Sequence, residues 1–255
     1  MKLKDQVAIV TGAGSGIGRA IALKLAKEGA DIVIVYHKNY ANAEESAQMI
    51  KNIGRQALVY KADVGDINIY PNLINVILNN FGRIDCLVNN AGIFIPKPLL
   101  EMTEEIWDET LDTNLKAALF GTQAVARHWV KVHKSGKVVN IGSIHATRSW
   151  VTLTAYASSK VGLKGLTKIM ASELAPYKIN VNMVSPGLIA TDITKEWAKN
   201  PDFKERIHRE IALDRMGNPE EVANLVLFLV CDEGNYITGT ELIIDGGLLL
   251  YSYSI

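Results

Sequence analysis

A tyrosine and a lysine four positions apart carry the clearest chemistry in the sequence. Tyr156 and Lys160 lie in a helical pattern that extends to about Ala175, so both side chains are expected on one helix face. A free phenol has a pKa near 10 and is a poor base at neutral pH. A lysine charge roughly 4 Å away, at an effective dielectric near 20, favours the phenolate by about 4 kcal/mol, or about three pKa units. The pair is therefore expected to transfer a proton near neutrality.

Other polar residues accompany this pair in positions where strands end. Ser143 follows the predicted strand 137–141 by two residues, and its hydroxyl is expected to hold a substrate oxygen beside the tyrosine. Asn114 lies in a helix-like segment, and the block 89–92 (Asn-Asn-Ala-Gly) follows another strand. Taken singly, each asparagine is more simply a cap or turn residue. Only the combination indicates a catalytic site.

A glycine-rich turn near the N-terminus is suited to hold a phosphate. It spans residues 11–18 (Thr-Gly-Ala-Gly-Ser-Gly-Ile-Gly), follows the apolar strand 7–10 and leads into a helical pattern over 19–28. Glycines let the backbone approach a pyrophosphate closely, and the helix N-terminus supplies free N–H donors. A strand, a turn and a helix in this order predict a dinucleotide site.

The elements that must position these residues alternate along the chain. Short β-rich runs are separated by segments with apolar residues at helical spacing, such as Ile17, Ala20, Ile21 and Leu25. Several runs are continuously apolar, as expected for strands covered on both faces. The pattern predicts a single α/β domain over residues 1–255, a Rossmann-type doubly wound parallel sheet flanked by helices. Its strands are expected at 7–10, 31–36, 57–61, 84–88, 137–141, 179–184 and 241–244.

Residues 190–218 interrupt this alternation with many charged residues and interleaved aromatic ones. The segment predicts one or two short amphipathic helices. Because it follows the carboxyl end of a strand, where ligands bind in α/β sheets, we expect it to form a lid over a substrate cleft. A solvated surface excursion is the alternative.

Composition limits the classes of partner. Lysine plus arginine and aspartate plus glutamate both total 27, so the formal net charge is zero. A nucleic-acid or membrane-surface partner would usually require a basic excess, and neither is expected. Cys86 and Cys231 and the five histidines show no metal-site spacing, so no metal is expected. The first residues enter a strand directly, and no apolar run is long enough to span a bilayer, which predicts a cytoplasmic protein.

Along essentially its whole length the chain resembles the short-chain dehydrogenase/reductase family. The glycine spacing Gly12-x-x-x-Gly16-x-Gly18 differs from the longer-known G-x-G-x-x-G and is similar to that of this family. The resemblance also rests on further motifs in the family's order: Asp63-Val64, 89–92, Asn114, Ser143, Tyr156, Lys160 and Pro186-Gly187.

The resemblance implies a catalytic mechanism. Tyr156 would exchange a proton with the substrate oxygen, and Lys160 would lower its pKa and bind the nicotinamide ribose. Ser143 would orient the substrate, and Asn114 would hold a water in a proton relay. Hydride would pass directly between the nicotinamide and the carbon that bears the oxygen.

The resemblance also implies a nicotinamide cofactor. Family members that prefer NAD usually end the second strand with an acidic residue, where this chain has Tyr36, followed by His37 and Lys38. His37 and Lys38 would attract the extra phosphate of NADP, with a plain surface lysine as the alternative for Lys38. Against this, Ser15 stands where strongly NADP-preferring relatives often have arginine. Use of both cofactors with a slight preference for NADP is expected. The implied contacts are Gly12, Ser15, Gly16, Ile17, Gly18, Tyr36, His37, Lys38, Asp63, Val64, Asn90, Ala91, Gly92, Tyr156, Lys160, Pro186, Gly187, Ile189 and Thr191.

The segment after Ser143 indicates a substrate. His145 and Trp150 resemble positions in the family's glucose 1-dehydrogenases, so an aldose such as glucose is expected to contact Ser143, His145, Trp150 and Tyr156. Asn182 is a further candidate sugar ligand. The alternative is a 3-oxoacyl-carrier-protein reductase or other carbonyl reductase, with basic residues at the cleft such as Arg127, Lys131 and Lys134. A non-enzymatic NADP-binding protein would be expected to lack Tyr156, Lys160 or Ser143. Family members are usually tetramers, and the apolar tail 248–255 is consistent with a homotetramer or with packing on its own domain.

Overall fold

A single parallel sheet organises the computed structural model, which describes residues 1–191, 194, 197 and 199–250. Residues 192–193, 195–196, 198 and 251–255, parts of the predicted lid and tail, lie outside the described residues. The strand order is β3-β2-β1-β4-β5-β6-β7, and every neighbouring pair is parallel. The predicted fold and its seven strands are confirmed. The strands are β1 (Val7–Thr11), β2 (Asp31–Tyr36), β3 (Ala57–Lys61), β4 (Cys86–Asn89), β5 (Gly136–Ile141), β6 (Ile179–Pro186) and β7 (Glu241–Ile244).

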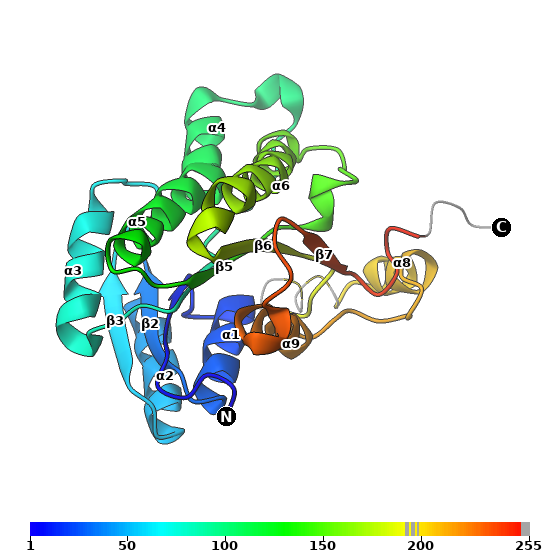
Figure 1. Cartoon of the computed structure of the whole chain (residues 1–255). Helices are drawn as coiled ribbons and strands as arrows, with labels where there is room; N and C mark the ends of the chain where they lie inside the picture. The colour runs from blue at the N-terminus through cyan, green and yellow to red at the C-terminus, as the bar shows by residue number, and fades with distance from the viewer. Residues whose placement is uncertain (192–193, 195–196, 198, 251–255) are drawn as a thin grey trace.

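Helices cover both faces of the sheet, which explains why its strands are continuously apolar. Helices α1, α2 and α9 lie on one face, and α3, α5 and α6 lie on the other (Figure 1). Their bounds are α1 (Gly16–Lys27), α2 (Tyr40–Asn52), α3 (Ile69–Phe81), α4 (Glu104–Leu111), α5 (Ala117–Lys131), α6 (Thr154–Leu174), α8 (Pro201–Glu210) and α9 (Pro219–Val230).

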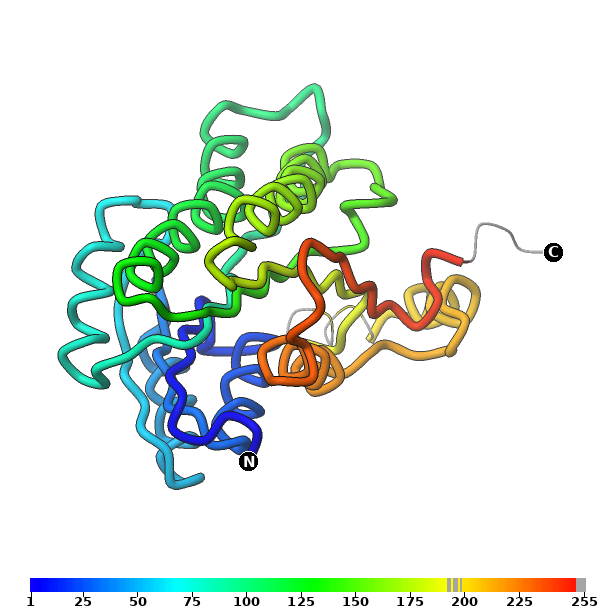
Figure 2. Tube along the Cα trace, viewed as in Figure 1, coloured from blue at the N-terminus to red at the C-terminus, as the bar shows by residue number. Residues whose placement is uncertain are grey.

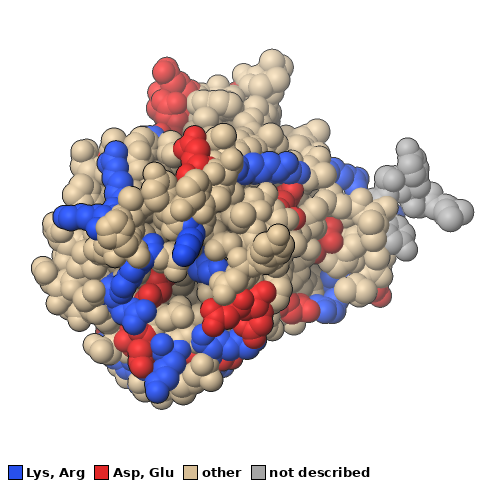
Figure 3. All heavy atoms as spheres, viewed as in Figure 1, with Lys and Arg blue, Asp and Glu red and all other residues tan. Residues whose placement is uncertain are grey.

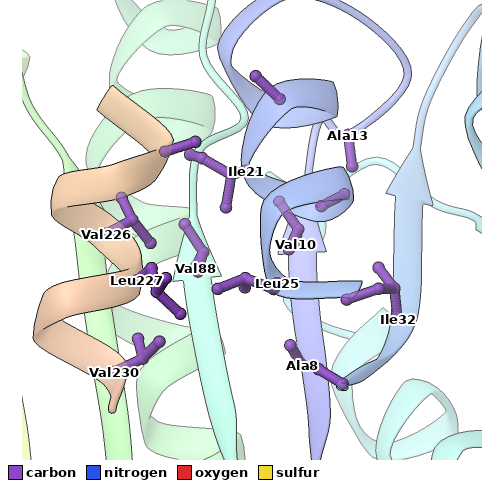
Figure 4. Packing of buried hydrophobic residues seen from close by; sticks show 14 of the residues in the cluster. Ala8, Val10, Ala13, Ile21, Leu25, Ile32, Val88, Val226, Leu227 and Val230 are labelled. Carbon is purple, nitrogen blue, oxygen red and sulfur yellow. The ribbon is translucent and has the colours of Figure 1, made fainter. Parts of the chain in front are cut away.

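The packing of α1 and α9 shows how helical spacing becomes a core. Ile21 and Leu25 of α1 are fully buried and face Val226 and Val230 of α9 over the sheet (Figure 4). The predicted apolar stripe of α1 is thus its core face. Fully burying such an aliphatic side chain contributes about 1.5–3 kcal/mol. This core fixes the direction of α1, and therefore the position of the glycine turn that precedes it.

The segment after β6 contains α8, an amphipathic helix as predicted for residues 190–218. Asn200 caps it by accepting a hydrogen bond from the Asp202 amide. Ile207 and Ile211 pack against Leu248, so the chain after β7 passes beside α8 (Figure 2). Leu248 and Leu249 of the tail therefore pack on their own domain, whereas Leu250 is exposed.

Both signs of charge are interspersed over the face seen in Figure 3, in keeping with the zero net charge of the sequence. Among the described residues, no helix combines the length and apolarity needed to cross a membrane.

Candidate active site

The candidate site lies where the strand order reverses. From β1 the chain builds one half of the sheet through β2 and β3, and from β4 it builds the other half. Ligands of open α/β sheets bind at the carboxyl ends of the strands at such a point. Here the two strand ends are tied together, because the Thr11 hydroxyl accepts hydrogen bonds from the amides of Asn90 (3.0 Å) and Ala91 (2.9 Å). The side chain of Asn90 in turn donates to the Thr11 carbonyl at 2.8 Å.

The glycine turn leaves room for a phosphate group. Gly12 and Gly16 have positive φ angles of 68° and 52°, which glycine adopts at no steric cost. A Cβ on Gly18 would lie 2.3 Å from the Gly12 carbonyl oxygen and 2.4 Å from Nδ2 of Asn90. Ser15 precedes α1 without capping it, so the side chain leaves the first amides of the helix open. These features fit the pyrophosphate of a dinucleotide.

Replacement of Gly18 by alanine is expected to raise the Kd for NADP(H) at least tenfold. The added carbon must push the first turn of α1 away from Gly12 and Asn90. Titration of NADPH fluorescence measures this change. Gly165→Ala in α6, where a Cβ meets nothing within 4 Å, is the matched control and is expected to bind the cofactor normally. Equal affinities of the two variants for NADPH would contradict the assignment of the glycine turn as the phosphate-binding site.

The tyrosine–lysine pair lies on one face of α6, as its spacing predicts. The ammonium of Lys160 is 5.6 Å from the centre of the Tyr156 ring and donates a 2.9 Å hydrogen bond to the Ile141 carbonyl. Burial lowers the pKa of Lys160 to about 8. Burial also raises the pKa of Tyr156, and a hydrogen bond with Ser143 opposes that rise. The predicted effect of Lys160 on the pKa of Tyr156 stays a prediction, since desolvation is the largest influence here.

Ser143 is held beside Tyr156 by a local turn. It follows β5 and begins the short helical turn Ile144–Ala146. Its hydroxyl oxygen accepts a hydrogen bond from the amide of His145 at 3.2 Å. Because that contact uses a lone pair, the hydroxyl proton is left to donate toward Tyr156 or a bound oxygen.

Asn114 lies behind the cleft, in the π-helical turn Asp112–Lys116 between α4 and α5. Its side-chain oxygen accepts from the Ile93 amide at 2.8 Å, and its NH₂ donates to the Ile93 carbonyl at 2.9 Å and to Ser159 at 3.2 Å. The amide thus fixes the chain after β4 against α6. A cavity of about 10 Å³ adjoins it, close to the size needed for one water. The relay water remains a prediction.

The structure gathers most predicted site residues around one cleft of about 540 Å³. Tyr36 ends β2, His37 and Lys38 follow it, and none of the three lines this cleft; Asp63, after β3, lies 4.0 Å from His37. Val64 borders the small cavity beside Asn114. The predicted residues that line the cleft are Gly12, Ser15, Gly16, Ile17, Gly18, Asn90, Ala91, Gly92, Ser143, His145, Trp150, Tyr156, Lys160, Pro186, Gly187, Ile189 and Thr191.

Two aromatic side chains that were not among the predicted site residues complete the cleft: Phe94, and Trp197 from the predicted lid segment. Phe94 packs edge-on against Tyr156 with ring centres 5.0 Å apart, and Trp197 lies 6.3 Å from Phe94. Both residues also border a second chamber of about 640 Å³ shared with Trp150. Phe94 closely follows the 89–92 block, whereas the position of Trp197 over the cleft carries no periodic signal.

One proposed sugar ligand is wrong. Asn182 is buried in β6, where it donates to the Ile237 carbonyl at 2.8 Å and accepts from the Thr240 amide at 3.2 Å. It therefore joins β6 to the segment before β7 and does not line the cleft. Among the described residues, no three His, Cys, Asp or Glu side chains gather in a way that would hold a metal ion.

Comparisons with known proteins agree with this geometry. Residues 12–249 match a family model described as "Enoyl-(Acyl carrier protein) reductase". L-rhamnose 1-dehydrogenase (NAD(P)(+)) of Azotobacter vinelandii is 38% identical over 98% of this chain and 99% of its own. 2-dehydro-3-deoxy-D-gluconate 5-dehydrogenase of Dickeya dadantii (strain 3937) is 34% identical over 97% and 96%. A short-chain dehydrogenase of Burkholderia cenocepacia J2315, solved in complex with NADP, superposes with a TM-score of 0.90 at 38% identity over 98% and 100% of the two chains.

The matches extend over nearly the whole chain, so Ser143, Tyr156 and Lys160 and nearly all of the glycine turn lie within the matched range. The chain therefore belongs to the short-chain dehydrogenase/reductase family, whose members act as NAD(P)-dependent oxidoreductases on alcohol groups.

Proposed function

We propose that this protein is a dehydrogenase that oxidises a hydroxyl group of an aldose such as glucose. The observation that carries the proposal is the convergence of Ser143, Tyr156 and Lys160 on a cleft that begins at the phosphate-binding turn. Two relatives named for sugar or sugar-acid substrates support a polyhydroxylated substrate. The aromatic residues Phe94 and Trp150 in the wall of the cleft support it too, because the apolar face of a sugar ring packs on aromatic side chains.

The residues of the cleft divide the chemistry among them. Tyr156, as a phenolate, accepts the hydroxyl proton while Ser143 holds the same oxygen, and Lys160 offsets the negative charge of the phenolate. The bound nicotinamide supplies the hydride acceptor. His145 and Trp150 contact the remainder of the substrate. In the reverse direction Tyr156 returns the proton to the new alkoxide.

The proposed cofactor preference is slight, with both NADP and NAD used. Tyr36 ends β2 where a carboxylate would bind the ribose of NAD, and Lys38 beside it is exposed and able to meet a phosphate. The Burkholderia structure with NADP and the relative named for NAD(P)(+) support use of both cofactors.

A 3-oxoacyl-carrier-protein or other carbonyl reductase is the second candidate. The apolar second chamber and the acyl-carrier description of the family model favour it. An acidic carrier protein would need basic residues at the cleft mouth. Arg127 and Lys131 instead border a groove of about 410 Å³ between α5 and α6, which shares no residue with the cleft.

Nicotinamide absorbance tests both candidates in one assay. The purified protein is given NAD and NADP in turn with a panel of aldoses and simple secondary alcohols. Reduction of either cofactor by glucose or a near epimer is the expected result. No cofactor reduction with any aldose, combined with oxidation of NADPH by acetoacetyl thioesters, would contradict the proposal and support the reductase.

We also propose a cytoplasmic homotetramer. The groove between α5 and α6 is lined by partly exposed apolar residues such as Leu119 and Val130, and the sequence has no net charge to oppose association. Residues 251–255 of the tail, assigned to either a subunit contact or the domain itself, are not described.

A further inference from the structure

The imidazole of His145 occupies a fixed position in the wall of the cleft. It is 8% exposed, and its ring meets those of Trp150 and Tyr156 edge-on, with centres 4.8 Å and 5.8 Å apart. A substrate whose reacting oxygen lies on Tyr156 and Ser143 therefore has its neighbouring atoms beside this ring. The identity of the imidazole nitrogen that faces them decides what those atoms must be.

A hydrogen bond with the backbone determines the tautomer. Nδ1 of His145 lies 3.1 Å from the carbonyl oxygen of Arg148. A carbonyl oxygen can only accept, so Nδ1 carries a proton and donates it. Burial lowers the pKa of His145, the hydrogen bond with the Arg148 carbonyl opposes this change, and Arg206 lowers the pKa further, so the net shift favours the neutral imidazole. In a neutral imidazole protonated at Nδ1, Nε2 has a lone pair and no proton.

The Nε2 atom of His145 is left without a hydrogen-bond partner by the described residues of the protein. In the described part of the chain, every fully buried side-chain nitrogen or oxygen has a partner, so an unpartnered nitrogen cannot be fully buried. Nε2 is therefore accessible, and the space that His145 lines is the catalytic cleft. Arg206, which reaches the same wall, stacks on Trp150 at 4.4 Å and donates to Glu210 at 3.0 Å.

We propose that Nε2 of His145 accepts a hydrogen bond from a hydroxyl group on the carbon next to the reacting carbon. The inference builds on the proposed oxidation of an alcohol at Tyr156 and names its substrate class: vicinal diols and, in reduction, α-hydroxycarbonyls. A substrate without that hydroxyl leaves Nε2 facing an apolar group with its lone pair desolvated. A site that hydrogen-bonds its substrate discriminates strongly against an analogue without the donor, because a buried polar group is then left unpaired. This discrimination is larger than the one that the size of an apolar pocket gives.

Two substrate pairs isolate this hydroxyl. Glucose and 2-deoxyglucose differ only at the carbon next to the anomeric one, and acetoin and 2-butanone differ in the same way next to a carbonyl. The wild-type enzyme is expected to prefer the hydroxylated member of a pair by about tenfold or more in kcat/KM. His145→Phe keeps an aromatic ring against Trp150 and Tyr156 but has no nitrogen, and is expected to reduce the preference to near unity. His145→Gln restores an acceptor and is expected to recover most of it.

The outcomes separate this inference from the proposed function. Equal kcat/KM for both members in the wild-type enzyme, or a preference unchanged in His145→Phe, would overturn the role of His145 while leaving sugar oxidation intact. No activity on glucose, with a His145-dependent preference for acetoin over 2-butanone, would support the role and reject the aldose. No turnover of all four compounds would reject both. NADPH titration of each variant confirms that the cofactor site is folded.

Discussion

Replacement of Tyr156 by phenylalanine is expected to lower kcat at least a thousandfold while cofactor binding stays near the wild-type level. Phenylalanine retains the ring contacts with Phe94 and His145, which lie 5.0 Å and 5.8 Å away, and removes only the phenol oxygen. General acid–base catalysis by one group typically contributes 10²–10⁴-fold. Ser143 also loses the group that it hydrogen-bonds. Steady-state turnover and NADPH titration on the same preparation measure the two effects.

The pH dependence of the wild-type enzyme is a second test of Tyr156 as the residue that accepts the proton. Burial raises the pKa of Tyr156, so the phenolate fraction, and with it kcat/KM for alcohol oxidation, is expected to rise with pH above neutrality. Ser143→Ala removes the hydrogen bond that lowers this pKa and is expected to move the profile to higher pH. Tyr177→Phe, at a half-exposed tyrosine outside the cleft, is the control. A Tyr156→Phe enzyme with more than a tenth of wild-type kcat would refute the catalytic role.

The fold was predictable because its elements carry strong local signals. Continuous apolar runs produced all seven strands, and the alternation with helical stripes produced their parallel order. The errors lie at the ends of elements: β4 begins at Cys86 rather than at residue 84, and β6 continues to Pro186. Strand ends depend on hydrogen bonds with neighbouring strands, which local composition does not encode.

The site was predictable where the position of a residue along a strand or helix determines the direction of its side chain or backbone. Tyr156 and Lys160, four residues apart on one helix, are such a case, and so is the glycine turn after β1. The prediction that Asn182 binds a sugar is wrong because a polar residue in a strand can bind neighbouring backbone groups instead of a ligand. Trp197 lies in the segment predicted to cover the cleft, but its contact with Phe94 was not predicted, because it depends on tertiary packing.

Electrostatics inside the cleft were the least predictable feature. The sequence estimate placed Lys160 about 4 Å from the phenol in a medium of moderate dielectric. In the structure both groups are desolvated, and the ammonium donates to the Ile141 carbonyl. Burial therefore disfavours the charged form of each residue, which a spacing argument cannot anticipate.

Replacement of Lys160 by methionine is expected to abolish activity and to make the cofactor-free protein more stable at pH 7. Burial of Lys160 lowers its pKa from 10.5 to about 8, so the folded state at pH 7 carries a cost of about 3 kcal/mol for holding the charge. Methionine fills a similar volume without a charge. It loses the hydrogen bond from the charged ammonium to the Ile141 carbonyl, worth about 2 kcal/mol, which leaves a gain of about 1 kcal/mol in the free energy of unfolding.

The sign of the pH dependence distinguishes this account from a packing effect. Between about pH 8 and pH 10.5 the unfolded lysine holds a proton that the folded lysine has released, so stability contributed by Lys160 rises with pH in this window. The advantage of Lys160→Met is therefore largest below pH 8 and is expected to disappear as the pH approaches 10.5. Urea denaturation across this range measures it, with Lys168→Met, at an exposed lysine of the same helix, as the control. A stability difference that does not change with pH, or a variant less stable than wild type at pH 7, would contradict this account. Either result would show that the buried charge of Lys160 does not destabilise the folded protein.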